Sequence, residues 1–279
     1  MPRFWDGLSR EVEDLLSVHA TLPAEVHYLA DIRHWILIQM AIALHFERQC
    51  DETRPPLSPK TLTAAIAVTG IASRNTVRAF LNEMTRVQLT DHPPRAVQRQ
   101  RAPQVSRKSE RLMLTYIDTH LRALDTIDGG SRSGALRRRP GMLAYLQPCF
   151  ARRICLSPAW YDPPAEVRLF TNSASGSSVL HDLVLSARQR SADAEGRIWV
   201  GQVAAAQVAQ RYQVSVAHVA RMFGKARTLG AMGWARPGNR GDCWISEGLG
   251  RAYLSWQAEK LAALSAACPE AWARAGVSG

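Results

Sequence analysis

The chain has 279 residues, of which 46% are hydrophobic and 21% are charged. This composition is typical of a globular protein and excludes an intrinsically disordered chain, and the length leaves room for two ordinary domains. The net charge of +11 is concentrated in two segments: residues 71–111 carry nine Arg or Lys against three Asp or Glu, and residues 211–251 carry seven against two. Because these surpluses together equal the net charge, the rest of the chain is neutral. Positive charge gathered in this way favours a polyanionic partner such as nucleic acid.

The cysteines and the apolar segments indicate where the protein works. The five cysteines form no Cys-x-x-Cys pair, so we expect reduced thiols. The longest apolar stretch, Trp35–Phe46, is much shorter than the roughly twenty residues of a membrane span and predicts a buried helix. The N-terminus lacks the apolar centre of a signal peptide. We therefore expect a soluble, cytoplasmic protein with no membrane partner.

The first predicted helices lie in the N-terminal part of the chain. Ala24–Gln49 contains neither Gly nor Pro and is apolar around its circumference, which predicts a long buried helix. Ser58 followed by Pro59 is the pattern of an N-cap and a first helical residue. These two residues predict a second helix over Lys60–Thr69.

A turn and a third helix follow. Gly70–Ala72 predicts the turn, and Ser73 predicts the cap of a helix whose apolar residues recur at helical spacing up to Val87. The stretch from Asp91 to Pro103 is rich in Pro, Arg and Gln and predicts the tip of a hairpin. The long helix Ser106–Ile127 closes the first half.

The second half is predicted to repeat this order of elements. Its leading helix, within Ala165–Arg190, is expected to be shorter and to start near Ser177, because the residues before it are polar and small. The elements that follow are the helices Val203–Tyr212 and Ser215–Leu229, a strand from Gly230 to Trp234, a turn over Arg236–Asp242, a strand over Cys243–Ile245 and a closing helix over Ser246–Ala267.

The order of elements repeats because segments of the sequence repeat. Three pairs of segments correspond: Pro23–Val26 with Pro164–Val167, 141 residues later; Ser73–Arg78 with Ser215–Ala220, 142 later; and Val105-Ser106 with Ile245-Ser246, 140 later. A period of this length indicates duplication of a whole domain. We therefore predict domains at 1–128 and 141–279, joined by a Gly- and Ser-rich linker at 129–140.

Helix, turn, helix and basic hairpin in this order predict a winged helix-turn-helix. The expected fold is mainly α with small β-hairpin wings, in two tandem copies. In such a fold the second helix of the motif enters the major groove, where Arg can bind guanine and Asn adenine. In the first copy the expected DNA contacts are Ser73, Arg74, Asn75, Thr76 and Arg78 on the helix and Arg95, Arg99 and Arg101 on the wing. The alternative is that these arginines only solvate an exposed helix.

The second copy is chemically poorer. Its expected DNA contacts are Ser215, His218, Arg221 and Lys225 on the helix and Arg236 and Arg240 on the wing. Val216, Ala217 and Ala220 occupy positions where the first copy has Arg or Asn, so this helix is expected to hold phosphates more than to read bases. A helix-turn-helix that only packs is the alternative.

The segment Ile245–Arg251, Ile-Ser-Glu-Gly-Leu-Gly-Arg, is similar to the strand-to-helix passage of the MarR family of bacterial regulators, commonly Leu-Thr-Glu-x-Gly. The order of elements in each copy also resembles a MarR protomer, although Pro93, Pro94 and Pro103 depart from the usual wing. The resemblance implies DNA binding, terminal helices that pair two protomers, and a small aromatic effector at their junction. With both copies in one chain, it implies a monomer that acts as a pseudo-dimer on half-sites roughly 34–36 Å apart.

The expected function is therefore sequence-specific binding of double-stranded DNA by a bacterial transcriptional regulator. A tandem winged-helix replication initiator of a plasmid or phage, and a scaffold whose winged helices bind protein, are the alternatives. No phosphate loop or hydrolase motif is present, so no enzymatic activity is expected. His27, Asp31 and His34 share a helix face that could bind a metal, but contacts with neighbouring side chains are favoured, and no metal or cofactor is expected.

Overall fold

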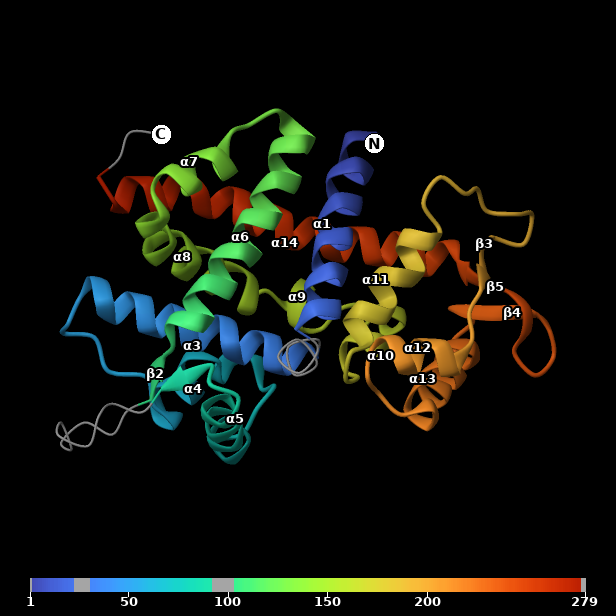
Figure 1. Ribbon diagram of the computed structural model, residues 1–279, viewed down its shortest axis with the longest axis horizontal. Coiled ribbons are helices and arrows are strands. Elements are labelled where there is room, and N and C mark those ends of the chain that lie inside the picture. Colours follow the sequence, from blue (N-terminus) through green and yellow to red (C-terminus); the bar gives the residue numbers. More distant parts are fainter. Residues whose placement is uncertain (1, 23–30, 92–102, 277–279) are drawn as a thin grey trace. The chain divides into compact units, whose positions relative to one another are not determined.

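The computed structural model describes residues 2–22, 31–91 and 103–276, and it is mainly helical with two small antiparallel sheets (Figure 1). The chain forms two compact units, each built from two separate segments. Unit 1 comprises Met1–Ile32 and Asp162–Ala258, and unit 2 comprises Arg33–Tyr161 and Glu259–Gly279. This division differs from the predicted domains at 1–128 and 141–279, because the predicted linker at 129–140 lies inside unit 2.

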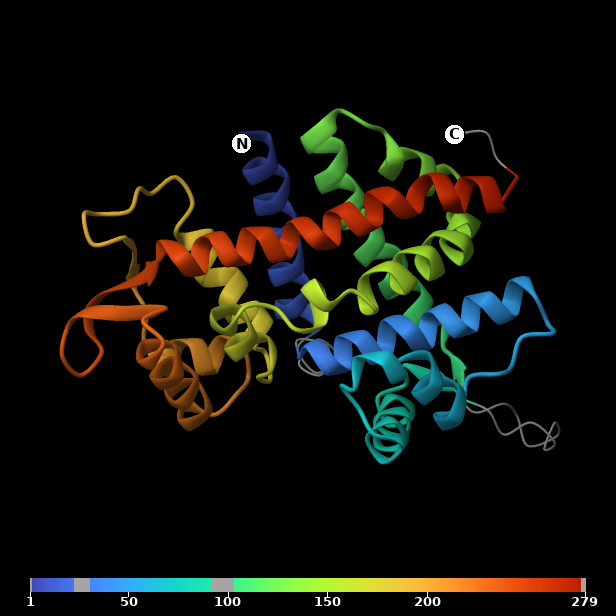
Figure 2. The ribbon, with the colours of Figure 1, turned by 180° about the vertical axis from the view of Figure 1, so that it is seen from behind.

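Unit 1 contains the larger sheet. Its elements are α1 (Pro2–Thr21), α10 (Ala165–Thr171), α11 (Gly176–Ser186), β3 (Arg197–Gln202), α12 (Ala205–Arg211), α13 (Val216–Thr228), β4 (Met232–Arg236), β5 (Arg240–Ser246) and the first part of α14 (Glu247–Arg274). The central strand is β5, with β3 and β4 antiparallel on either side. In both ribbon views α12 and α13 lie beside this sheet (Figures 1 and 2). The predicted hairpin of the second half is confirmed, and α11 begins next to the predicted Ser177.

Unit 2 is almost entirely helical. Its elements are α3 (Ile32–Cys50), α4 (Pro59–Ala65), the 3-10 helix η1 (Ala67–Thr69), α5 (Arg74–Arg86), β1 (Thr90–Asp91), β2 (Gln104–Val105), α6 (Arg107–Asp128), α7 (Arg132–Arg138), the 3-10 helix η3 (Pro140–Met142), α8 (Leu143–Cys155), α9 (Pro158–Tyr161) and the end of α14. The strands β1 and β2 form a two-stranded ladder in which Thr90 pairs with Val105. In both views α4 and α5 lie beside α3 (Figures 1 and 2).

The long helix α3 forms the centre of unit 2. It begins at Ile32, whereas the sequence predicted a start at Ala24; residues 24–30 lie outside the described ranges. Ile36, Leu37 and Met40 are fully buried, as a helix that is apolar on all sides requires. The prediction of a buried core helix is confirmed. None of the helices in the described ranges combines the length and the apolar character that a bilayer span requires.

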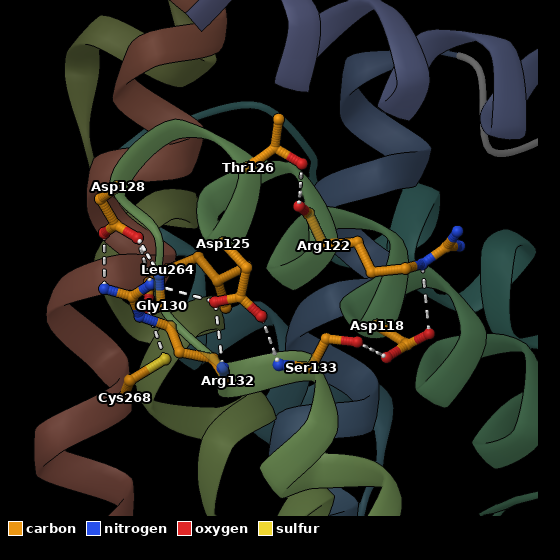
Figure 3. Close-up of polar contacts among 10 residues, drawn as sticks. All are labelled: Asp118, Arg122, Asp125, Thr126, Asp128, Gly130, Arg132, Ser133, Leu264 and Cys268. Atoms are coloured by element: carbon orange, nitrogen blue, oxygen red, sulfur yellow. Dashed lines mark hydrogen bonds and ion pairs between the residues drawn. The ribbon is translucent and has the colours of Figure 1, made fainter. Parts of the chain in front are cut away.

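The Gly- and Ser-rich segment predicted as a linker is held by carboxylates of α6 (Figure 3). The two oxygens of Asp125 accept hydrogen bonds from the backbone N–H groups of Arg132 (3.0 Å) and Ser133 (2.9 Å). The Ser133 hydroxyl donates to Asp118 at 2.6 Å. These bonds satisfy N–H groups in the first turn of α7, which have no partner within the helix. The segment therefore forms a helical corner instead of a free linker.

The ion pair between Asp128 and Arg132, 2.7 Å long, should make this corner sensitive to acid. Hydrogen bonding to Arg132, opposed by burial, holds the pKa of the Asp128 carboxyl below its ordinary value. A carboxyl whose pKa is lowered by folding stabilises the fold above its unfolded pKa of about 4 and loses that effect as the pH falls through its folded pKa. We expect Asp128→Asn to be less stable than the wild type at neutral pH, with the difference shrinking in acid. Urea unfolding over a pH series measures the difference in the free energy of unfolding between the two proteins. A difference that does not change with pH would contradict the expected role of the Asp128 charge.

Candidate nucleic-acid interface

The first candidate reading helix is α5, and a serine cap fixes its start. Ser73 has an extended backbone, and its hydroxyl accepts a hydrogen bond from the backbone N–H of Thr76 at 3.2 Å. The buried side of α5 consists of Val77, Phe80, Leu81 and Met84. With this apolar face packed inward, the opposite face of the helix is left in solvent.

The polar residues predicted to read bases lie on that outer face. Arg74, Asn75 and Arg78 are all exposed, as are Ser73 and Thr76. The hydroxyls of Ser73 and Thr76 lie 3.0 Å apart and contact each other. The structure therefore brings all five predicted residues of this helix to one exposed end.

The helix before it is positioned as the sequence predicted. The Ser58 hydroxyl accepts from the backbone N–H of Thr61 at 3.1 Å, and the Thr61 hydroxyl accepts from the backbone N–H of Ser58 at 2.9 Å. This reciprocal capping box starts α4, with Pro59 as its first residue. Gly70, at φ 61°, then adopts the left-handed conformation of the turn before α5.

The second candidate reading helix, α13, starts in the same way. The Ser215 hydroxyl accepts from the backbone N–H of His218 at 3.1 Å. Its buried side consists of Val219, Met222, Phe223 and Ala226. The His218 side chain is half-buried, and its Nε2 lies 3.2 Å from the carbonyl oxygen of Ala174. It is thus engaged inside unit 1, in contrast to the exposed residues of α5.

The basic residues predicted to contact DNA from unit 1 lie on α13 and on the β4–β5 turn. Arg221 and Lys225 are exposed on α13. Arg227, further along the same helix, donates a hydrogen bond of 3.0 Å to the side-chain oxygen of Asn239. This bond connects the end of the helix to the tip of the hairpin.

Two arginines face each other across that hairpin. Arg236 and Arg240 are direct partners in the β4–β5 ladder, and both are exposed. Gly238 and Asn239 between them have φ of 77° and 58°, a region that Gly and Asn adopt more readily than other residues. Like charges directly opposite each other destabilise a strand pair. A bound anion would relieve this repulsion.

The corresponding tip of the first hairpin is not part of the described structure. Arg95, Arg99 and Arg101, predicted to contact DNA from that tip, lie outside the described residues.

Hydrogen bonding after the two helices follows one pattern in both units. The N–H of Leu89 donates to the carbonyl of Met84 at 2.8 Å, and the N–H of Ala231 donates to that of Ala226 at 2.9 Å. The carbonyl of each of these donor residues in turn accepts from the N–H of a serine further along the chain. Ser106 donates to Leu89 at 3.1 Å, and Ser246 donates to Ala231 at 2.9 Å. The two segments leave their helices by the same local path.

Several arginines outside these surfaces are held in ion pairs. Arg152 pairs with Glu47 at 2.8 Å, Arg188 with Asp6 at 2.7 Å and Arg197 with Asp193 at 2.9 Å. Within the described ranges, no ion pair is formed by Arg74, Arg78, Arg221, Lys225, Arg236 or Arg240. Exposed cations without acidic partners create a field that attracts anions.

A cluster missed by the sequence interpretation supports α12. The Tyr212 hydroxyl donates to Asp182 on α11 at 3.0 Å, and Arg211 binds the same carboxylate oxygen at 2.5 Å. Burial, reinforced by the charge of Asp182, raises the pKa of Tyr212 above its ordinary value. Because Asp182 lies about thirty residues before its partners, no local sequence motif predicts these contacts.

Comparison of the chain with protein-family models, curated proteins and solved structures found no match. Within the described ranges, no three His, Cys, Asp or Glu residues are grouped so that they could hold a metal ion. The geometry of the two basic surfaces is therefore the basis for assigning a function.

Proposed function

We propose that the protein is a sequence-specific double-stranded DNA-binding protein, a bacterial transcriptional regulator that acts as a single-chain pseudo-dimer. Its reading elements would be two winged helix-turn-helix motifs, MarR-like in architecture and related by internal duplication. The observation that carries the proposal is the set of exposed cations Arg74, Arg78, Arg221, Lys225, Arg236 and Arg240, which form no ion pair within the described ranges. Binding to phosphates neutralises such a set.

The order of the elements supports the winged-helix interpretation. In unit 1, α12, α13, β4 and β5 follow one another, and β3 pairs with β5 to complete a three-stranded sheet. In a helix-turn-helix protein the second helix enters the major groove. The hairpin after that helix then supplies the wing, and Arg227 connects the two.

Matching details in the two units support the duplication. The caps Ser73 and Ser215 are 142 residues apart and have the same hydrogen bond to the third residue after them. The acceptors Met84 and Ala226 described above have the same separation, as do their donors. A shared ancestor of the two units explains why these details recur at constant spacing.

The chemistry of α5 favours sequence-specific recognition over nonspecific attraction. Arg74 and Arg78 carry guanidinium forks that can bind guanine O6 and N7, and the Asn75 amide can bind adenine. These groups are exposed near the N-terminus of the helix, the part that contacts base edges in helix-turn-helix proteins.

Replacing Arg78 with Ala tests this assignment. We expect a loss of about 1–3 kcal/mol on the preferred site and a smaller loss on random DNA, because a base contact is lost along with a charge. Arg86→Ala is the matched control: it removes the same side chain from the last turn of α5, where Glu83 binds the guanidinium at 2.5 Å. Binding titrations on both DNAs measure the effect, on a site first identified by footprinting of genomic DNA. Equal losses of Arg78→Ala on both DNAs would show that Arg78 holds only phosphate.

A further inference from the structure

The helices α5 and α13 present different chemistry from equivalent positions. Both begin after a serine cap, and residues 142 apart occupy the same turn in each. Where α5 exposes Arg74, Asn75 and Arg78, α13 exposes Val216, Ala217 and Ala220. Three hydrogen-bonding side chains are thus replaced by three that end in methyl groups.

The polar residues beside this face already make hydrogen bonds within unit 1. The Ser215 hydroxyl accepts the capping bond from the N–H of His218, and the His218 ring lies against the carbonyl of Ala174. Val216, by contrast, is 51% exposed to solvent. What the N-terminal end of α13 offers to a partner is therefore a small apolar surface.

The surroundings of this surface favour a nucleic acid over an apolar protein partner. Arg221 and Lys225 follow on the same helix, and Arg236 and Arg240 on the hairpin; all four are exposed and form no ion pair within the described ranges. A methyl-rich face among unpaired cations is complementary to a groove with phosphates along its edges. In the major groove, the apolar group on a base edge is the C5-methyl of thymine.

We propose that Val216, Ala217 and Ala220 contact thymine methyl groups, so that the motif of unit 1 recognises thymine-containing sequence while α5 recognises guanine and adenine. The inference rests on the proposed DNA-binding function and extends it. It gives the second motif a reading role, whereas the sequence alone suggested that it mainly holds phosphates. The full binding site then consists of two half-sites with different chemistry.

Replacing thymine with deoxyuridine tests the proposal, because it removes only the C5-methyl group. The full chain is titrated with its footprinted duplex and with duplexes in which each thymine in turn is deoxyuridine. We expect about a fourfold loss of affinity for each contacted methyl, from the usual value of burying one such group. The sensitive positions should lie in one half of the site.

Two valine variants complete the experiment. Val216→Ser should abolish the loss at the position that Val216 contacts, and its thermal unfolding should match the wild type because the side chain is exposed. Val68→Ser is the matched control, since Val68 is a 73% exposed valine on η1, which belongs to unit 2; it should keep the full deoxyuridine effect.

The outcomes separate the two proposals. Binding without any deoxyuridine effect, or an effect that Val216→Ser leaves unchanged at every position, would overturn the thymine inference and leave DNA binding intact. Failure to bind any duplex even in low salt would overturn the proposed function, and the inference with it.

Discussion

Affinity for double-stranded DNA is expected to fall roughly 10³–10⁵-fold between 50 and 200 mM salt if the two motifs together contact on the order of 6–10 phosphates. The physical reason is the release of counterions from DNA by the exposed cations on the N-terminal half of α5, on α13 and on the β4–β5 turn. Titrations at a series of salt concentrations give the slope of log affinity against log salt, which measures the number of phosphates neutralised.

A variant of Arg240 on the β4–β5 turn makes the salt test specific to this surface. Arg240→Ala should reduce that slope by about one. Arg188→Ala is the control and should leave the slope unchanged, because in the wild type Asp6 already binds the Arg188 guanidinium at 2.7 Å. Affinity that does not change with salt would contradict the DNA-binding proposal and favour a protein-binding scaffold.

Replacing Phe223 with Ala is expected to destabilise unit 1 by about 3–5 kcal/mol. Phe223 is fully buried on α13, and its ring centroid lies 5.6 Å from that of Trp234 on β4. The substitution leaves a cavity between the candidate reading helix and the sheet, so the position of α13 should loosen and DNA affinity should fall as well. Urea unfolding followed by tryptophan fluorescence measures the loss, with Trp234 as a reporter next to the cavity.

Leu229→Ala is the matched control for this substitution. Leu229 follows the same helix but is 51% exposed, so its removal should change stability by no more than about 0.5 kcal/mol. Similar losses for the two variants would mean that α13 does not pack on the sheet through Phe223.

The elements that the sequence predicts well are those specified by local chemistry. Ser58, Ser73 and Ser215 start helices because a serine hydroxyl can accept from a free N–H in the first turn, and each does so in the structure. The β4–β5 turn was recognisable because Gly238 and Asn239 tolerate positive φ. The candidate reading helices were therefore predictable almost to the residue.

What the sequence did not reveal depends on distant contacts. Gly129 and Gly130 have the composition of a linker, yet the carboxylate of Asp125 accepts the N–H groups that start α7. The strand β3 was missed because no short turn joins it to its partner β5, whose paired residues lie 40 or more positions further along the chain. Helix α1 was also not predicted, because it precedes the first of the repeated segments, which begins at Pro23.

In the candidate site, too, features set by local sequence were predictable and features set by distant contacts were not. The exposure of Arg74, Asn75 and Arg78 follows from helical spacing and was predictable. The engagement of His218 by Ala174 was not, because the carbonyl comes from a loop more than forty residues earlier. Sequence spacing gives the face on which a side chain lies, but only the fold shows whether a neighbour already occupies its polar atoms.

The interleaving of the two units has a consequence for how the chain is synthesised. Residues 33–161 leave the ribosome early, but unit 2 still lacks the end of α14, from which Glu270 pairs with Arg153 at 2.7 Å. Unit 1 has its first segment at once and must wait for residues 162–258. Domains usually fold one after another from the N-terminus during translation. Here neither unit has all its parts until most of the chain has emerged, so both must be completed late and nearly together.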